Sequence, residues 1–410
     1  MFKILILTPQ IPYPYWFYGR SSLYFLIKSL LNKGLEIHLS FPIANIKENE
    51  KNIEHLKSLG IKVYPFEYNT NDRVSLLIKN IFEEDPFKIK KYWNRTYYEM
   101  IENICISIKP DIIQVHTPHM FKYGALLSKK YNIPIILRVQ DIVHNQVKTF
   151  KEEVRNPLYK FIAGWQYGKT IKYELKAWKQ ANKIIFITKQ DYDYAINKLQ
   201  IDPDKCVYIY DGINLKDNIY LNKKSKKKAF VFMASDQKPN VISLKWFINI
   251  WKRISNKINF EFHVYGKVCE SFEREKNALK NFKIFLNGYI DNPDELHTTL
   301  AEYLSFISPT IQGSGYRTKI FEAMSIGLPV ISTEFDYKPI EPLFEENKDI
   351  LVFNNEEELF NIIKMIEKNE LTLHDISSKV HEKIRREYTW EKTADRFVDV
   401  YNDLLSKKGG

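Results

Sequence analysis

The sequence predicts an α/β protein of two Rossmann-like, doubly wound domains with a cleft between them. Apolar runs of strand length alternate along the chain with amphipathic stretches of helical length, which is typical of parallel sheets covered by helices. The alternation stops after the turn signal Asp211-Gly212 and begins again near Ala229, so the pattern occurs twice. The 410 residues suffice for two domains of about 150–200 residues each.

The expected strands are continuous apolar runs, as in sheets whose two faces are both covered by helices. In the first half of the chain they are Lys3–Thr8, Glu36–Phe41, Lys62–Pro65, Ile112–His116, Ile133–Val139, Lys183–Thr188 and Val207–Tyr210. In the second half they are Ala229–Met233, Phe260–Tyr265, Lys283–Phe285, Leu304–Ser308, Pro329–Thr333 and Ile350–Phe353. The clearest helical patterns are Ser21–Asn32, Tyr97–Ile108, Asn156–Ala181 and Thr389–Leu405.

These elements divide the chain into four parts. The first domain is expected over residues 1–215 and the second over residues 229–388. Residues 216–228 are expected to form a solvated basic linker, because five of the last six are lysines. Residues 389–410 predict a C-terminal helix that packs back toward the first domain. Ligands of open α/β sheets bind outside the carboxyl ends of the strands, so we expect the site where these ends face each other across the cleft.

Charge and cysteine content narrow the function classes. The net charge of +11 favours an anionic partner such as nucleic acid, an acidic membrane or a phosphorylated substrate, although a merely soluble basic protein has the same charge. The three cysteines lie far apart without a CxxC pair, which argues against a zinc site or a disulfide framework and for reduced cytosolic thiols. The N-terminal apolar run is too short for a signal peptide, and no run approaches the roughly 20 apolar residues of a membrane span. We therefore expect a cytoplasmic protein that meets a membrane only at its surface.

The segment SPTIQGSGYRTKIFEAMSIGLPVIST carries the strongest chemical signal. A strand ends at Ser308, Gly313-Ser314-Gly315 form a glycine-rich turn, and a helix is expected from about Arg317 to Ile326. Glycines let the backbone approach a ligand closely. Free N–H groups and the positive dipole at a helix start favour an anion.

Two cations stand in the first turn of that helix. Arg317 and Lys319 work against the helix dipole, but they fit a phosphate or diphosphate that is held by both side chains. Glu322, further along, is able to turn toward the cleft and accept hydrogen bonds from ribose hydroxyls. A glycine-rich turn with surface charges is the alternative, but the fixed order of glycines, cations and carboxylate favours the anion site.

The segment resembles the donor-binding motif of retaining GT-B glycosyltransferases of family 4, in the subgroup that reads G-S-G-x-R-x-K-x-x-E-A-M-x-x-G-x-P-V. Further features match this family in order: Pro12-Tyr13-Pro14, Gly19-Arg20, Arg155-Asn156-Pro157, Tyr173-Glu174, Asp191, Tyr210-Asp211-Gly212-Ile213, Pro239-Asn240, Gly266, Gly288-Tyr289-Ile290 and Tyr388-Thr389-Trp390. This ordered set is specific for the superfamily but not for the sugar.

The resemblance implies the GT-B architecture and a metal-independent, retaining transfer from a nucleotide-diphosphate sugar to a glycan, glycolipid or other acceptor, without a cofactor. It implies donor binding by Gly19, Arg20, Gly288, Tyr289, Ile290, Gly313, Ser314, Gly315, Tyr316 and Glu322. Within that set the base would lie against residues 288–290, and Glu322 would bind the ribose. Arg317 and Lys319 would hold the diphosphate and stabilise the charge that it gains as it leaves. Synthesis of cell-surface polysaccharides or glycoconjugates is the expected setting.

Two positions depart from the family pattern. Ser314 stands where many relatives carry a glutamate, which removes one expected sugar contact. In the segment RVQDIVH, Gln140 stands at the position of a histidine, and His144 at that of a second histidine. Gln140 can hydrogen-bond a sugar hydroxyl but cannot act as an acid. Gln140 and His144 are both candidate catalytic residues, and a surface loop histidine is the alternative for His144.

Two further features have competing interpretations. Asp191-Tyr192-Asp193 looks like a DxD metal motif but stands at a helix start, where carboxylates favour the dipole, so we expect no metal there. The segment Lys151–Gln180 contains seven Lys or Arg, three Glu and several aromatic residues. Such a helix suits an anionic membrane and a lipid-linked acceptor. A packed helix with a solvated basic face is the slightly favoured alternative.

Other functions remain as alternatives to glycosyl transfer. A nucleotide-sugar epimerase of the same fold would need carboxylates for deprotonation, and the sequence does not identify them. A non-catalytic nucleotide-sugar-binding relative is conceivable from Gln140 and Ser314, but the intact Gly-Arg-Lys-Glu set argues against it. The charge alone suggests a nucleic-acid binder, and no binding motif supports one. We therefore expect no nucleic-acid partner.

Overall fold

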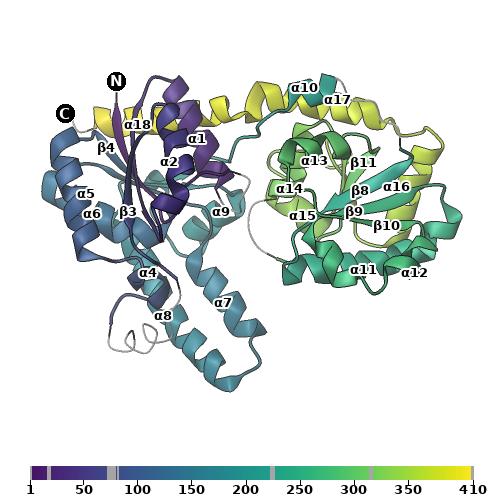
Figure 1. The fold of residues 1–410 in the computed structure, drawn as a ribbon, viewed down its shortest axis with the longest axis horizontal. Helices are drawn as coiled ribbons and strands as arrows, with labels where there is room; N and C mark the ends of the chain where they lie inside the picture. The colour runs from purple at the N-terminus through teal and green to yellow at the C-terminus, as the bar shows by residue number, and fades with distance from the viewer. Residues whose placement is uncertain are drawn as a thin grey trace. The chain divides into compact units, whose positions relative to one another are not determined.

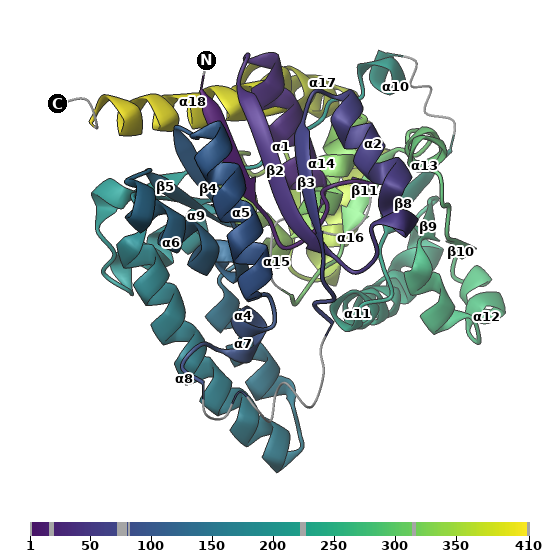
Figure 2. The same ribbon diagram turned by 60° about the vertical axis from the view of Figure 1, so that its left-hand side comes forward.

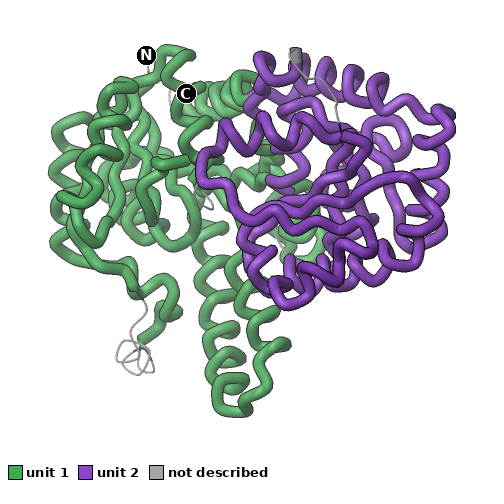
Figure 3. The backbone as a smooth tube through the Cα atoms, turned by 45° about the vertical axis from the view of Figure 1, so that its right-hand side comes forward, with its two compact units in different colours: residues 1–212, 390–410 green, residues 213–389 purple. Residues whose placement is uncertain are grey.

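A computed structural model describes the chain in two compact units (Figures 1 and 3). Unit 1 comprises residues 1–212 and 390–410, and unit 2 comprises residues 213–389. The structure describes residues 2–15, 20–71, 80, 83–221, 227–313 and 317–407. The predicted donor-binding residues Gly19, Ser314, Gly315 and Tyr316 lie outside the described residues.

Unit 1 is built around a seven-stranded parallel sheet in the order β3-β2-β1-β4-β5-β6-β7. Figure 2 shows β2 and β3 side by side. The strands are β1 Lys3–Leu7, β2 Glu36–Ile43, β3 Lys62–Glu67, β4 Ile112–His116, β5 Ile135–Val139, β6 Lys183–Phe186 and β7 Cys206–Tyr208. Each corresponds to one predicted strand. The strand order reverses between β1 and β4, and doubly wound sheets bind ligands at such a point.

The helices of unit 1 cover this sheet and extend beyond it. They are α1 Ser21–Asn32, α2 Glu50–Ser58, α4 Phe87–Lys90, α5 Arg95–Ile108, α6 Phe121–Tyr131, α7 Val143–Glu153, α8 Pro157–Gln180, α9 Lys189–Asn197 and α18 Trp390–Ser406. The predicted long helix is α8, which begins at Pro157 because Asn156 accepts hydrogen bonds from the next N–H groups. Sequence analysis missed α7, whose short buried stripe of Val143, His144 and Val147 gives little periodicity.

The C-terminal helix α18 packs in the core of unit 1. Phe397 and Tyr401 are buried in one cluster with residues of β1 and α1, and the Tyr401 hydroxyl donates to Gln114 Oε1 at 2.6 Å. A Cβ on Gly212 would lie 2.5 Å from the backbone of Trp390. Glycine is therefore required where the chain passes the start of this helix.

Unit 2 has a six-stranded parallel sheet in the order β10-β9-β8-β11-β12-β13. Its strands are β8 Ala229–Met233, β9 Glu261–Tyr265, β10 Ile284–Gly288, β11 Ser305–Ser308, β12 Val330–Thr333 and β13 Leu351–Phe353. Its helices are α10 Asp217–Leu221, α11 Lys238–Ile254, α12 Lys276–Lys280, α13 Pro293–Leu300, α14 Thr318–Ser325, α15 Glu334–Tyr337, α16 Glu356–Glu367 and α17 Leu373–Lys383. The prediction of two doubly wound α/β domains is confirmed.

The segment expected as a linker is partly helical. The helix α10 packs on unit 2, where the Tyr220 ring stacks on His381 at a centroid distance of 3.8 Å and Asp217 pairs with Arg385 at 2.8 Å. Its lysine-rich continuation, residues 222–226, lies outside the described residues. The half-buried Tyr220 gives α10 an aromatic contact with α17, which the surrounding charged residues did not indicate. Within the described ranges, no helix is both long and apolar enough to cross a membrane.

Candidate functional site

The carboxyl ends of the central strands of unit 2 lead to the predicted anion site. The sheet is parallel, so β8, β11 and β12 end at the same edge. The chain after β8 brings Asn240 to this edge, the chain after β11 brings Arg317 and Lys319, and the chain after β12 brings Asp336. Asn240 and Asp336 hold the two cations, and neither pairing was predicted from the sequence.

Arg317 lies directly before α14, and its side chain is buried. Its Nε lies 2.9 Å from Asp336 Oδ1, in an ion pair that is not aligned as a hydrogen bond. Its Nη2 donates to the carbonyl of Phe335 at 3.3 Å. Burial lowers the pKa of Arg317, and Asp336 opposes this effect, so the guanidinium stays charged. The short helix α15, which directly follows β12, thus fixes the position of this cation.

Lys319 is held from the opposite side by α11. Its Nζ donates to Asn240 Oδ1 at 2.9 Å and lies 5.1 Å from the centre of the Phe232 ring. The amide of Asn240 in turn donates to the Ser235 hydroxyl at 3.0 Å. Burial lowers the pKa of Lys319, Asp336 opposes this, and Arg317 lowers it further. A fixed and partly desolvated ammonium therefore stands in the first turn of α14.

Glu322 lies one turn further along α14. Its Oε1 is 2.7 Å from Nε2 of His297, a buried side chain of α13. The Glu322 side chain is 38% exposed, so a ligand can reach the carboxylate. Sequence analysis did not identify His297, since a contact between two helices leaves no local pattern. Such a partner orients a binding carboxylate before the ligand arrives.

The predicted base-binding residues follow β10. Gly288 ends this strand with φ +83, Tyr289 is exposed and Ile290 is half-buried. The Gly288 carbonyl accepts a hydrogen bond from the N–H of Gly266 at 2.7 Å. A Cβ on Gly266 would lie 2.1 Å from the carbonyl oxygen of Ala234, so only glycine allows the ends of β8 and β9 to approach this closely.

Gly313 is exposed, with φ +126, and follows β11. A Cβ there would lie 3.6 Å from Pro239 at the start of α11. A left-handed backbone at this position explains why the turn needs glycine. Gly313 and Arg317 flank the predicted phosphate loop, and both lie at the carboxyl edge of the sheet.

In unit 1, Arg20 and Gln140 lie at the carboxyl edge of the sheet. Arg20 precedes α1 and donates to the Tyr13 carbonyl at 3.4 Å, and burial lowers its pKa. Gln140 follows β5 directly and is half-buried. Thr117, after the neighbouring β4, has φ +67, which is unusual for a β-branched residue and typical of functional sites.

His144 is fully buried in the first turn of α7, so a surface loop histidine is the wrong interpretation. Its Nδ1 lies 2.7 Å from Glu174 Oε2 on α8, and its Nε2 lies 3.2 Å from the hydroxyl of Tyr194 on α9. Glu174 also accepts hydrogen bonds from the backbone N–H groups of Val143 and His144. The imidazole therefore links three helices, and Glu174 stabilises the start of α7.

Asp141 stands between Gln140 and α7 and was not singled out from the sequence. Burial, with a smaller contribution from Asp191, raises its pKa to about 6. Burial also raises the pKa of Asp191, whose Oδ2 accepts the Thr188 hydroxyl at 2.8 Å. Asp191 lies in the first turn of α9, as predicted for helix-start carboxylates. Within the described part of the chain, no group of three or more His, Cys, Asp or Glu side chains is arranged for a metal ion.

Two family models match this chain. The model described as glycosyltransferase family 4 matches residues 23–217, and the model described as glycosyl transferases group 1 matches residues 227–369. Together they cover the strands β2 to β13 and the segment that contains Arg317, Lys319 and Glu322. No curated protein sequence matches the chain significantly.

Solved structures of low sequence identity share the fold. Sucrose-phosphate synthase from Thermosynechococcus elongatus is 13% identical with a TM-score of 0.70, over 99% of this chain and 100% of that chain. Anabaena HepE in complex with UDP is 12% identical with a TM-score of 0.67, over 98% and 100%. A TarM mutant from S. aureus, in complex with fondaparinux, alpha-GlcNAc-glycerol and UDP, is 15% identical with a TM-score of 0.65, over 98% and 100%.

Two parallel α/β units, together with the solved structures that share them, place the chain in the class of GT-B proteins. The two family models add the activity to this fold. The chain is a glycosyltransferase with the GT-B fold.

Proposed function

We propose that this glycosyltransferase moves a sugar from a nucleoside-diphosphate donor to a glycan or lipid-linked acceptor, without a metal and with retention of the anomeric configuration. The observation that carries the proposal is the pair of cations at the start of α14. Arg317 is fixed by Asp336 of α15 and Lys319 by Asn240 of α11, and burial lowers the pKa of both. Cell-surface polysaccharide or glycoconjugate synthesis, in the cytoplasm, is the proposed setting.

The difficult step is departure of the nucleoside diphosphate from the anomeric carbon. The leaving oxygen gains negative charge, and cations that already point at it need no reorganisation during the reaction. The positive end of α14 adds to their field. Because Asp336 and Asn240 hold the cations before the donor binds, they act as positioning residues in this proposal.

The remaining donor contacts are proposed for residues at the carboxyl edge of each sheet. Glu322, oriented by His297, is proposed to accept hydrogen bonds from the ribose, and residues 288–290 to lie against the base. Arg20 and Gln140 are proposed to contact the diphosphate or the sugar. Since the imidazole of His144 is fully buried, we propose that it positions the chain next to Gln140 and does not touch the sugar. HepE binds UDP-glucose, which makes uridine diphosphate sugars the first donors to test.

The test compares alanine variants at the two cations in the full chain. A thermal-shift screen with nucleotide sugars first identifies the donor, since a bound ligand raises the melting temperature. Arg317→Ala and Lys319→Ala are then each expected to lower kcat by about 10²–10³, as loss of one charge-stabilising donor does. Lys338→Ala removes an exposed lysine of the same unit, which pairs with Glu341, and serves as the matched control.

Circular dichroism and the melting temperature show whether each variant is folded. Near-normal turnover in folded Arg317→Ala and Lys319→Ala would refute the diphosphate role. Equal losses in Lys338→Ala would mean that the assay reports general charge and not a specific site.

A further inference from the structure

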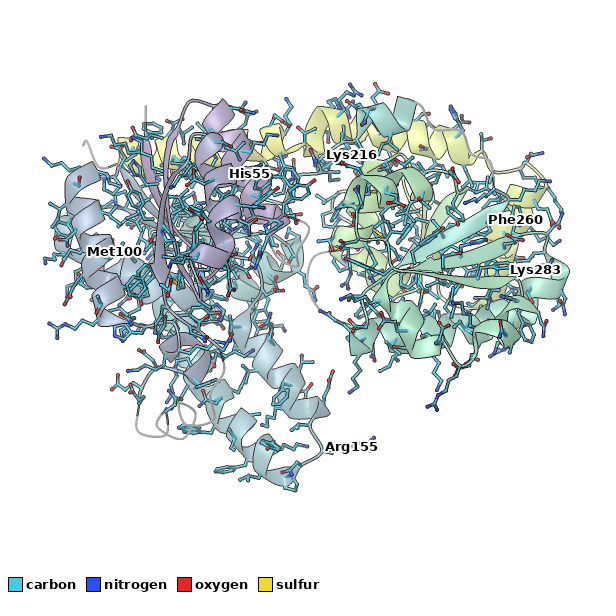
Figure 4. The ribbon with its side chains drawn as sticks, in the orientation of Figure 1. His55, Met100, Arg155, Lys216, Phe260 and Lys283 are labelled. Atoms are coloured by element: carbon cyan, nitrogen blue, oxygen red, sulfur yellow. The ribbon has the colours of Figure 1, made fainter. Side chains whose placement is uncertain are left out.

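The helices α7 and α8 run side by side and project from the sheet of unit 1 as a hairpin (Figures 1 and 2). Arg155 lies in the turn at its far end (Figure 4). The root of the hairpin is held by buried residues of α8 such as Trp178, which packs in the core of unit 1. We call residues 148–161 the hairpin tip.

The hairpin tip exposes large apolar side chains. Phe161 is 75% exposed, Leu158 64% and Phe150 56%, and these are the three most exposed large hydrophobic side chains of the described residues. Tyr159 is exposed beside them. Leu158 and Phe161 are three residues apart on α8 and therefore share a helix face. Apolar side chains gathered in this way mark a surface that another phase or molecule covers.

The same segment also carries basic side chains. The hairpin tip contains four basic residues and only two glutamates. The basic residues are Lys148, Lys151, Arg155 and Lys160. The stem of Lys151 packs along α8, where a Cβ on Gly164 would lie 3.3 Å from Lys151 Cε. Long basic side chains commonly cover apolar surface with their stems and keep their charge at a polar boundary.

The occupant that fits both features is an anionic lipid surface. Aromatic and leucine side chains enter the headgroup boundary while Lys and Arg contact lipid phosphates. A second copy of this chain fits less well, because each copy carries a net charge of +11 and like basic tips repel. A projecting tip also suits insertion into a soft surface, since it presents side chains outward from both helices.

We propose that the hairpin tip docks the enzyme on anionic membranes by inserting Phe150, Leu158 and Phe161 at the headgroup boundary. Membrane docking would bring the enzyme to a lipid-linked acceptor, and only in this respect does the docking proposal rest on the proposed function. Vesicle binding needs no donor or acceptor, so the docking and the sugar transfer fail or succeed independently.

The first test is sedimentation of the full chain with vesicles of phosphatidylcholine alone or with added phosphatidylglycerol. Wild type is expected to bind the anionic vesicles and to be released by high salt. The triple variant Phe150→Ser, Leu158→Ser, Phe161→Ser is expected to bind at least about tenfold more weakly, since it loses three inserted side chains. Ile106→Ser changes a 50% exposed side chain on α5 of the same unit and is the matched control.

The second test places a fluorescent reporter at the tip. The three natural cysteines are buried, so an environment-sensitive dye reacts with the introduced thiol in Phe161→Cys. Its emission is expected to shift to the blue when anionic vesicles are added, and the dye on Ile106→Cys is expected not to respond. An unchanged melting temperature shows that each variant is folded.

Three results would overturn the docking proposal. The first is wild type that does not sediment with anionic vesicles. The second is a folded triple variant that binds them as tightly as wild type. The third is a dye at position 161 whose emission does not change when the vesicles are added. A concentration-dependent dimer that the triple variant loses would assign the tip to a second copy instead. Loss of turnover in Arg317→Ala with normal vesicle binding would support both proposals separately.

Discussion

Replacement of Asp141 by asparagine should stabilise the protein at neutral pH and leave its stability nearly unchanged near pH 4. Burial, with Asp191 adding repulsion, raises the pKa of Asp141 from 3.8 to about 6. The folded state therefore binds its proton more tightly than the unfolded chain does. This contribution to stability is fully present below about pH 4 and is lost as the pH rises through 6. Asparagine has a similar shape and does not ionise.

The pKa difference sets the size of the effect. The pKa of Asp141 is about two pH units higher in the folded protein than in the unfolded chain. At about 1.4 kcal/mol for each unit, this corresponds to roughly 3 kcal/mol of unfolding free energy at pH 7. This figure is an upper limit, because the neighbouring charges of Asp191 rearrange when Asp141 changes. Asp191 in turn responds to Glu174 and His144, so these three groups must keep their contacts in the variant.

Urea unfolding of wild type and Asp141→Asn between pH 4.5 and 7.5 measures the effect. The difference in unfolding free energy should grow with pH and level off above pH 7. Asp193→Asn is the control, since Asp193 is solvent-accessible and pairs with Lys189 one turn away, a contact worth less than about 1 kcal/mol. A difference that is independent of pH, or a variant less stable than wild type at pH 7.5, would refute the burial of an ionised Asp141.

Two further predictions concern the donor site. Glu322→Ala should weaken nucleoside-diphosphate binding by about tenfold, because a charge-assisted hydrogen bond is lost. His297→Ala should weaken binding less, because it only releases the Glu322 carboxylate. Equal affinities of wild type and both variants in calorimetry would contradict the ribose assignment. EDTA should leave turnover unchanged if Arg317 and Lys319 stabilise the leaving group. Loss of activity that a divalent ion restores would show that a metal takes that role.

Most strands could be predicted because they are largely apolar runs that are buried on both faces. All residues of β4 and β5 are buried, and their runs stand out between polar helices. The edge strand β3 is only half-buried, and its predicted end at Pro65 falls short of Glu67. The start of α14 could be placed to within one residue because the glycine-rich turn precedes it and Gly327 follows it.

The partners of the site residues could not be predicted, since they stand on helices that are distant in the sequence. Asp336 reaches Arg317 only because β11 and β12 are neighbours in the sheet. The sequence leaves both a catalytic and a surface role for His144, because the burial of its imidazole depends on Glu174 and Tyr194, which belong to two other helices. A single sequence gives the type of each side chain at the sheet edge, and the topology decides which of them meet.

The balance of charge at α14 is the strongest physical reason to expect an anion there. Arg317 and Lys319 are both desolvated. The free-energy cost of burying a cation is smaller when a carboxylate pairs with it. Among the described residues, Asp336 is the carboxylate that acts on both, and it stands with them at the positive end of a helix. Asp336 opposes the effect of burial on both cations, and the positive end of α14 adds to their field. In the proposed function, a bound diphosphate would add negative charge beside both cations, so its binding should relieve the cost of burial as well as form new contacts.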